Sequence, residues 1–238
     1  HNVPTADRAY LVNRVAAEKY PDVKFTAFGG LCLNHPVGGL NPDAVETSLK
    51  LGAKVIWLPT NTAENHYRKN GKDPSKGVVV TRDGKAVDEL QDIFALVKQY
   101  NAVLATGHIG AEECFPVVEA ARAAGVEKIV ITHPEFWVVG MTPEQQADIV
   151  RKYDVLLESV YAQPVNGSYK INIPDNIAAM KAIGPEHFVI STDSGQTVNP
   201  YWYESYTTYF KAVSEVFTPE QVRKMTHDNP AWLLDIDQ

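Results

Sequence analysis

The sequence lacks the marks of several large protein classes. Its only two cysteines, Cys32 and Cys114, show no CxxC or zinc-ribbon spacing, so we expect reduced thiols in the core. No apolar run approaches the roughly 20 residues of a membrane-spanning helix, and the first residues do not resemble a signal peptide. A phosphate-binding glycine loop and the GxSxG motif of serine hydrolases are also missing. These features predict a cytoplasmic protein with no nucleotide loop and no serine nucleophile.

Positive charge is also scarce. Lys and Arg number 22 against 29 Asp and Glu, which gives a net charge of −7, and phosphate binding needs a basic face. The 238 residues are 45% hydrophobic, enough for a large core, and no Pro/Gly/Ser-rich linker interrupts them. We therefore predict a single domain over residues 1–238 that acts on a small molecule and not on nucleic acid or a membrane. A homo-oligomer is compatible with this composition.

Short apolar runs alternate with helical patterns along the chain, which is typical of a parallel α/β sheet. We predict strands over residues 25–33, 55–58, 103–106, 129–132, 155–157 and 188–191. Helices are predicted over residues 7–19, 42–51, 87–99, 112–124, 143–152, 174–183, 203–216 and 219–225. Thr142 and Thr218 each precede a Pro and stand three residues before a Gln, which is the capping-box pattern of a helix start.

The number of strands sets a problem for the fold. A (β/α)₈ barrel has eight strands over about 250 residues. Six strands do not close such a barrel, and the first predicted element is a helix with no strand before it. Either the chain forms a smaller open sheet, or the first two strands of a barrel lie upstream of residue 1.

Three of the predicted strands end in a side chain that can bind a metal: His108, His133 and Asp193. Parallel strands present their carboxyl ends on one face, where α/β enzymes carry their chemistry. Neutral imidazoles and a carboxylate are ligands of Zn²⁺, which lowers the pKa of bound water toward neutrality. A histidine or aspartate at a strand end is more often structural, so the shared position of the three residues is what favours a metal site.

At this point the chain resembles the amidohydrolase superfamily, whose distorted (β/α)₈ barrel has metal ligands on its first, fifth, sixth and eighth strands. If two strands precede residue 1, the resemblance places His108 on the fifth strand, His133 on the sixth and Asp193 on the eighth. It extends from about residue 25 to the chain end and rests on these stretches: Gly38-Gly39-Leu40-Asn41-Pro42, Trp57-Leu58-Pro59-Thr60, Ala105-Thr106-Gly107-His108, Ser191-Thr192-Asp193-Ser194-Gly195 and His227-Asp228-Asn229-Pro230-Ala231-Trp232-Leu233-Leu234. The expected fold is a TIM-type barrel with six of its eight strands in this chain.

The chain also departs from that superfamily. It contains no His-x-His, the pair that the first strand supplies there, and residues 58–60 offer no Lys or Glu as a bridging ligand. A mononuclear site, or a bridging ligand from a strand upstream of residue 1, is therefore favoured over a standard binuclear site. Zn²⁺ is the expected metal, with Mn²⁺ or Fe²⁺ as alternatives. His1 would follow the second strand and is a further candidate ligand, or an inert terminal residue.

Other residues are candidates for substrate binding. The connection over residues 61–86 is long for a β/α loop and suggests a lid with a small hairpin, or a surface ornament. It carries His66 and Arg68, which would meet an anionic substrate. Asn34 and His35 follow the first predicted strand and would reach the site, and Glu158, at the end of the fifth predicted strand, would bind substrate or support a ligand.

These residues lead to four functional hypotheses. The first is a metal-dependent hydrolase that uses activated water to cleave a C–N or C–O bond of an amide, lactam, ester or lactone. In it Asp193 transfers the proton and His133 binds the metal or steadies the developing charge. The second is a metal-dependent decarboxylase or lyase on the same scaffold. The third is a metal-free binding subunit, and phosphoester hydrolysis is a weaker enzymatic option because Arg68 is the only evident phosphate clamp.

Overall fold

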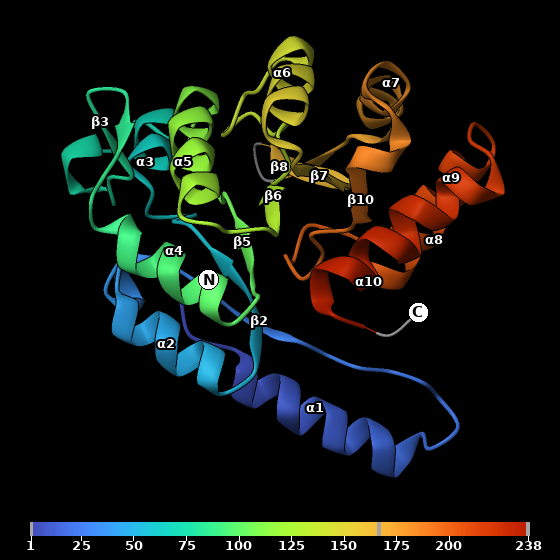
Figure 1. The fold of residues 1–238 in the computed structure, drawn as a ribbon. Helices are drawn as coiled ribbons and strands as arrows, with labels where there is room; N and C mark the ends of the chain where they lie inside the picture. The colour runs from blue at the N-terminus through green and yellow to red at the C-terminus, as the bar shows by residue number, and fades with distance from the viewer. Residues whose placement is uncertain (1, 166–167, 237–238) are drawn as a thin grey trace. The chain divides into compact units, whose positions relative to one another are not determined.

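The computed structural model describes residues 2–165 and 168–236 (Figure 1). The chain divides into two compact units, His1–Ile129 and Val130–Gln238. Each unit contains three of the six predicted parallel strands, and helices connect them. The six predicted strands are therefore all present, although their bounds shift by up to four residues.

In the first unit the strands are β1 (Gly29–Cys32), β2 (Ala53–Trp57) and β5 (Val103–Ala105), paired in parallel in that order. The prediction that the first strand begins at residue 25 was wrong, because Phe25 is 52% exposed and lies outside the sheet. Leu31, Ile56 and Leu104 are almost fully buried, so the apolar centres of the three strands form the core of this unit.

Helices of the first unit connect these strands. They are α1 (Ala6–Lys19), α2 (Pro42–Lys50), α3 (Glu64–Lys69), α4 (Leu90–Gln99) and α5 (Ala111–Ala123), with short turns η1 (His35–Val37) and η2 (Pro74–Lys76). Asn41 caps α2, since its side-chain oxygen accepts from the amides of Asp43 and Ala44. The expected small hairpin in the long connection is confirmed as β3 (Thr81–Arg82) and β4 (Lys85–Ala86).

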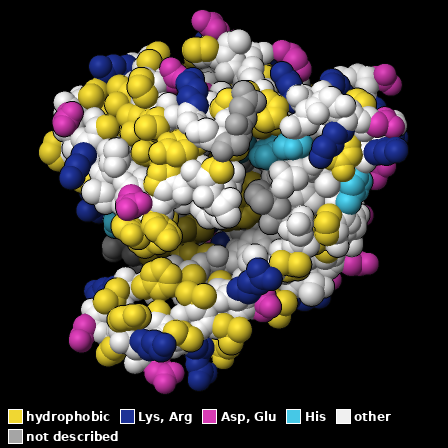
Figure 2. Space-filling view, turned by 180° about the vertical axis from the view of Figure 1, so that it is seen from behind, with side chains coloured by type: hydrophobic (Ala, Val, Ile, Leu, Met, Phe, Trp, Pro, Cys, Tyr) yellow, Lys and Arg dark blue, Asp and Glu magenta, His cyan; other side chains and the backbone are white. Residues whose placement is uncertain are grey.

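Apolar side chains stay exposed on and just after α1. Tyr10, Leu11 and Tyr20 are each at least 60% exposed. In the space-filling view, yellow side chains gather over this helix at the lower edge (Figure 2). The helix is held to β1 by polar contacts, because Asn13 donates to the carbonyl of Ala27 at 2.9 Å and Thr5 Oγ1 accepts from the Gly30 amide at 2.9 Å.

In the second unit the parallel strands are β6 (Ile129–Ile131), β7 (Leu156–Val160) and β10 (Phe188–Ser191), in that order. The prediction that the middle strand stops at residue 157 was wrong. β7 continues to Val160, and Glu158 therefore lies within the strand, where register with Val189 of β10 fixes its position. The antiparallel pair β8 (Ala162–Val165) and β9 (Ser168–Ile171) was not predicted.

Two of the five helices described in the second unit, α6 (Pro143–Tyr153) and α9 (Pro219–Arg223), begin at the capping threonines predicted from the sequence. The others are α7 (Ile173–Ile183), α8 (Trp202–Ser214) and α10 (Asn229–Leu234), with the 3₁₀ turn η3 (Pro185–His187). Thr142 and Thr218 accept from the amides of Gln145 and Gln221, so both predicted capping boxes are confirmed. The helix predicted over residues 219–225 instead passes after Arg223 into a π-helical turn, η4 (Lys224–Asp228). Among the described residues, no helix is long and apolar enough to cross a membrane.

Candidate functional site

His108 lies just beyond β5, and the residue before it, Gly107, has no room for a side chain. Gly107 adopts φ +65°, and a Cβ there would lie 2.5 Å from the carbonyl oxygen of Leu58. The His108 amide donates to the Pro59 carbonyl at 3.0 Å. Glycine at position 107 thus lets the end of β5 pack directly against the end of β2, and this packing fixes the backbone position of His108.

The ring of His108 faces that of His66, which comes from α3 in the long connection after β2. Their Nδ1 atoms are 2.8 Å apart, and the rings stack with centroids 4.9 Å apart and planes 15° from parallel. Asn65 Nδ2 donates to the His108 carbonyl at 3.0 Å, which ties the helix to the strand end. Burial lowers the pKa of His66, and the charge of Lys72 lowers it further. The pairing places His66 beside a predicted ligand, whereas the sequence suggested only a substrate contact.

Asn34 joins the ends of β1 and β2. Its side-chain oxygen accepts from the amides of Thr60 at 2.9 Å and Thr62 at 3.1 Å, and its nitrogen donates to Thr60 Oγ1 at 2.7 Å. The residue is fully buried. Asn34 therefore orders the loops around the strand ends, and its predicted contact with substrate stays a prediction.

The other two candidates in the first unit contact protein groups. His35 Nε2 lies 2.7 Å from the Lys76 carbonyl oxygen, a contact that joins η1 to the long connection. Arg68 pairs with Glu64 one helical turn earlier at 3.0 Å, and its side chain is 53% exposed. An anionic substrate at Arg68 would have to compete with the carboxylate of Glu64, which already pairs with this guanidinium.

His133 and Asp193 have an unusual backbone. Each follows a strand of the second unit by two residues, and their φ angles are +26° and +50°. Non-glycine residues with positive φ are uncommon and cost about 1–3 kcal/mol, and such strain concentrates at functional sites. His133 is 3% exposed and stacks on Phe136 at a centroid distance of 3.9 Å. Burial lowers the pKa of His133 to about 4, so its imidazole is neutral at pH 7.

Two buried carboxyl groups of the second unit, those of Asp193 and Glu158, have raised pKa values. Burial, and then the charge of Glu158, raises the pKa of Asp193 to about 7. Burial also raises the pKa of Glu158, against the opposing effect of a 2.8 Å hydrogen bond from Ser191 Oγ. A carboxyl group that titrates near neutrality can both accept and release a proton, which suits the acid–base role predicted for Asp193.

Glu135 belongs with these carboxyl groups and was not predicted. Burial first, and the charge of Glu158 among smaller effects, raise its pKa to about 8. Asn172 Nδ2 donates to Glu135 Oε1 at 3.1 Å, and Gln163 in turn donates to Asn172 Oδ1 at 2.8 Å. A carboxylate two residues after a strand-end histidine was the available signal in the sequence.

The imidazole pair of His66 and His108 fits a metal ion in part. Two neutral imidazole nitrogens that face each other are suitable donors for a divalent ion such as Zn²⁺. They supply two ligands, and across residues 2–165 and 168–236 no group of three or more His, Cys, Asp or Glu side chains is placed to hold an ion. The pair therefore fits part of a coordination sphere. His1, a further predicted ligand, lies outside the described residues.

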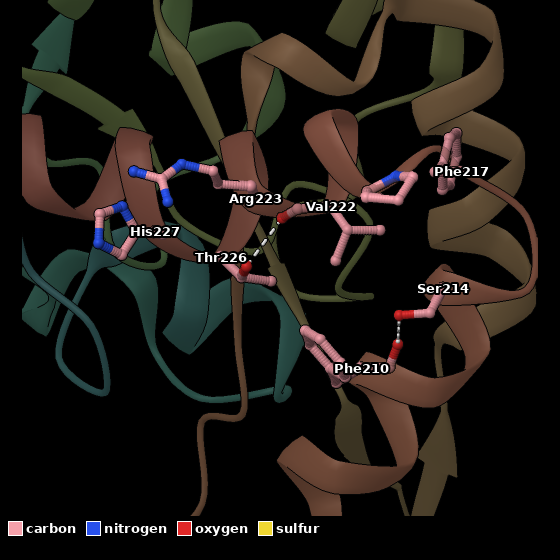
Figure 3. A pocket seen from close by; sticks show the side chains of 8 residues that line it. Phe210, Ser214, Phe217, Val222, Arg223, Thr226 and His227 are labelled. Atoms are coloured by element: carbon pink, nitrogen blue, oxygen red, sulfur yellow. Dashed lines mark hydrogen bonds between the residues drawn. The ribbon is translucent and has the colours of Figure 1, made fainter.

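A cavity of about 390 Å³ lies in the second unit, and none of the predicted site residues lines it (Figure 3). It is lined by Phe210, Ser214, Phe217, Pro219, Val222, Arg223, Thr226 and His227. Its hydroxyls donate to backbone carbonyls of their own helical turns, and both Arg223 and His227 contact Asp228 Oδ1, at 3.1 and 2.8 Å. Its polar groups thus have partners within the protein.

The comparison with protein families gives a match over most of the chain. A model described as a family of unknown function (DUF6282) matches residues 1–158. The chain belongs to this family. A search of curated proteins found no match.

Solved structures resemble the chain in fold. An amidohydrolase from Pseudomonas aeruginosa has a TM-score of 0.56 at 13% identity, over 82% of this chain and 67% of its own. The 2,6-dihydroxybenzoate decarboxylase from Rhizobium has a TM-score of 0.53 at 15% identity, over 98% of this chain and 78% of its own. A metallo peptidase from Rhodobacter sphaeroides has a TM-score of 0.55 at 11% identity, over 87% of this chain and 62% of its own. The chain thus spans 62 to 78% of the length of these three proteins. At such identities the likeness shows the fold, and it confirms the predicted α/β class with six parallel strands of a TIM-type barrel.

Proposed function

We propose that this DUF6282 member is a metal-dependent hydrolase that cleaves a C–N or C–O bond of a small amide, lactam, ester or lactone. The observation that supports it most is the backbone at the predicted site residues. His133 and Asp193 both have positive φ two residues after a parallel strand, at the strand ends where α/β enzymes place their chemistry. Strain kept at two such positions is expected where side-chain direction matters more than local stability.

Each residue has a role that its surroundings support. His108 would be a metal ligand, and the turn at Gly107 fixes its backbone position. Asp193 would accept a proton from the attacking water and release it to the leaving group, since its pKa lies near 7. Neutral, buried His133 would donate a hydrogen bond to the oxygen that gains charge. A bound divalent ion would supply Lewis-acid polarisation of the scissile bond.

A decarboxylase is the second candidate. Of the three structures described, the 2,6-dihydroxybenzoate decarboxylase covers the largest share of this chain, 98%. Protonated carboxyl groups such as Glu135, whose pKa is about 8, could return a proton to a carbanion after CO₂ leaves. The two candidates predict different products from different substrates.

The test is a substrate screen in H₂¹⁸O with Zn²⁺, Mn²⁺ or Fe²⁺ added. Hydrolysis of any lactone, ester, lactam or amide would place ¹⁸O in the product, whereas decarboxylation of an aromatic acid would release CO₂ and leave no ¹⁸O in the decarboxylated aromatic product. His108→Ala and Asp193→Asn should each reduce turnover by about 10²–10⁴-fold while the protein stays folded. Full turnover in either variant would rule out the proposed roles.

A further inference from the structure

The contact between His66 and His108 is unusual because two imidazole nitrogens of the same kind face each other. The two Nδ1 atoms are 2.8 Å apart. A neutral imidazole has one N–H, so without a cation one Nδ1 must donate and the other accept. With a cation beside the line that joins them, both nitrogens can act as ligands, because ligation needs each nitrogen deprotonated.

Hydrogen bonds fix the backbone of His108 and the distance of helix α3, which carries His66, from the end of β5. The His108 backbone is fixed by two hydrogen bonds: its amide donates to the Pro59 carbonyl, and its carbonyl accepts from Asn65 Nδ2, each at 3.0 Å. Asn65 precedes His66 in α3, so one residue sets the spacing of the helix from the strand end. The ring planes are 15° apart and the ring centroids 4.9 Å apart, so the two Nδ1 atoms, 2.8 Å apart, face each other between the ring centres.

The surrounding segment is also anchored independently of the histidines. The amide of Glu64 donates to the Val78 carbonyl at 3.0 Å, and the amide of Val78 donates to the Thr62 carbonyl at 2.7 Å. Gly77 packs so closely that a Cβ there would lie 2.4 Å from the Glu64 Cα. The long connection thus forms a fixed support for α3, and the place of His66 does not depend on its contact with His108.

We propose that His66 is a metal ligand, and that it binds the same divalent ion as His108. This inference rests on the proposed function, in which His108 is a ligand, and it replaces the substrate contact predicted for His66. Zn²⁺ takes imidazole nitrogens at about 2.0–2.1 Å and usually has four ligands in proteins. Two imidazoles leave positions for other donors and for an oxygen of water or substrate.

The test measures metal binding and not turnover. Isothermal titration of the metal-free protein with Zn²⁺ gives the affinity, and the nitrogen hyperfine splitting of bound Cu²⁺ counts the imidazole ligands. His66→Phe retains a flat ring that can stack on His108 but has no nitrogen. His227→Phe is the matched control, because it also removes an imidazole that is bonded to a neighbour, at 2.8 Å from Asp228 Oδ1.

We expect His66→Phe to lower the affinity for Zn²⁺ by about 100-fold or more, beyond the usual effect of losing a residue that only orients a ligand. The Cu²⁺ spectrum should lose one nitrogen, and His227→Phe should bind as the unaltered protein does. Thermal unfolding of the metal-free proteins shows whether the variant keeps its fold, and His66→Gln provides a second, polar variant if it does not.

The outcomes separate this inference from the proposed function. If His66→Phe and His66→Gln bind Zn²⁺ unchanged while His108→Phe does not, His66 is no ligand and the proposed function stands. If the unaltered protein binds neither Zn²⁺ nor Cu²⁺, both are overturned. If metal binding requires both histidines but no substrate is turned over, the ligand pair is supported and the proposed function fails.

Discussion

Asn172 Nδ2 donates a hydrogen bond to Glu135 Oε1 at 3.1 Å, and this contact ties the segment after β6 to the residue that precedes α7. Asn172 is itself fully buried and held by Gln163 at 2.8 Å. The network fixes the carboxyl group of Glu135 while burial raises its pKa to about 8. The folded protein therefore favours the protonated form of this group at neutral pH.

Glu135→Gln should change the pH dependence of stability. The pKa of Glu135 rises from 4.5 to about 8 on folding, so ionisation opposes the folded state increasingly as the pH rises from about 4.5 to 8. The uncharged Gln removes that effect. The free energy of unfolding of the variant, relative to the unaltered protein, should increase by at least about 1 kcal/mol between pH 5 and pH 8.

Urea unfolding in EDTA at both pH values measures this difference. Glu119→Gln, which changes an exposed carboxylate on α5, is the control and should show no such trend. A Glu135→Gln difference that is the same at pH 5 and pH 8 would show that the carboxyl group is not protonated in the folded state.

Gly107→Ala should destabilise the protein through close packing. Gly107 and Gly84 have similar φ angles, +65° and +72°, but a Cβ at 84 meets nothing within 4 Å, whereas at 107 it lies 2.5 Å from the Leu58 oxygen. Gly84→Ala should cost only the roughly 1–2 kcal/mol of a left-handed alanine. Gly107→Ala should cost about 1–3 kcal/mol more because backbone must move.

Chemical unfolding of the two alanine variants gives the comparison directly. Metal binding by Gly107→Ala should also weaken, since the start of His108 shifts. Equal losses of stability in the two variants would mean that β5 and the β2 end do not pack as described.

Asn34→Ala should lose the links between the ends of β1 and β2. Its side chain is buried and bonds both Thr60 and Thr62, so their amides would lack an acceptor. We expect a loss of about 2–4 kcal/mol, the sum of several unsatisfied buried groups. Asn70→Ala, which removes one exposed bond to the His66 carbonyl, should cost less than about 1 kcal/mol. A similar small loss for Asn34→Ala would contradict this role.

Much of the framework could be predicted from local patterns. The Thr-Pro-x-Gln starts at Thr142 and Thr218 became capped helices because all the required groups lie within four residues. β10 was predicted to the residue, since its apolar run has clear polar ends. The β8–β9 pair was missed because Pro164 and the polar Gln163 break the apolar alternation, although Asn166-Gly167 between them is a hairpin signal in the sequence.

The candidate site was less predictable. His108, His133 and Asp193 could be chosen because strand ends are visible in a sequence. The positive φ angles of His133, Asp193 and Gly107 could not be predicted, since φ at a loop residue depends on the packing around it. The His66–His108 contact joins residues 42 positions apart, and only the folded α3 and β5 bring them together. Glu135 was missed because its burial is set by the fold, and its hydrogen-bond partner Asn172 lies 37 positions along the chain.

The central claim is that this protein binds a divalent ion through His108. Its most direct test is the metal content of the pure protein after dialysis against Zn²⁺, compared with that of His108→Ala. We predict about one equivalent of zinc in the protein and a near-complete loss in the variant. Zinc below about a tenth of an equivalent in the unaltered protein, or an equal amount in His108→Ala, would contradict the account.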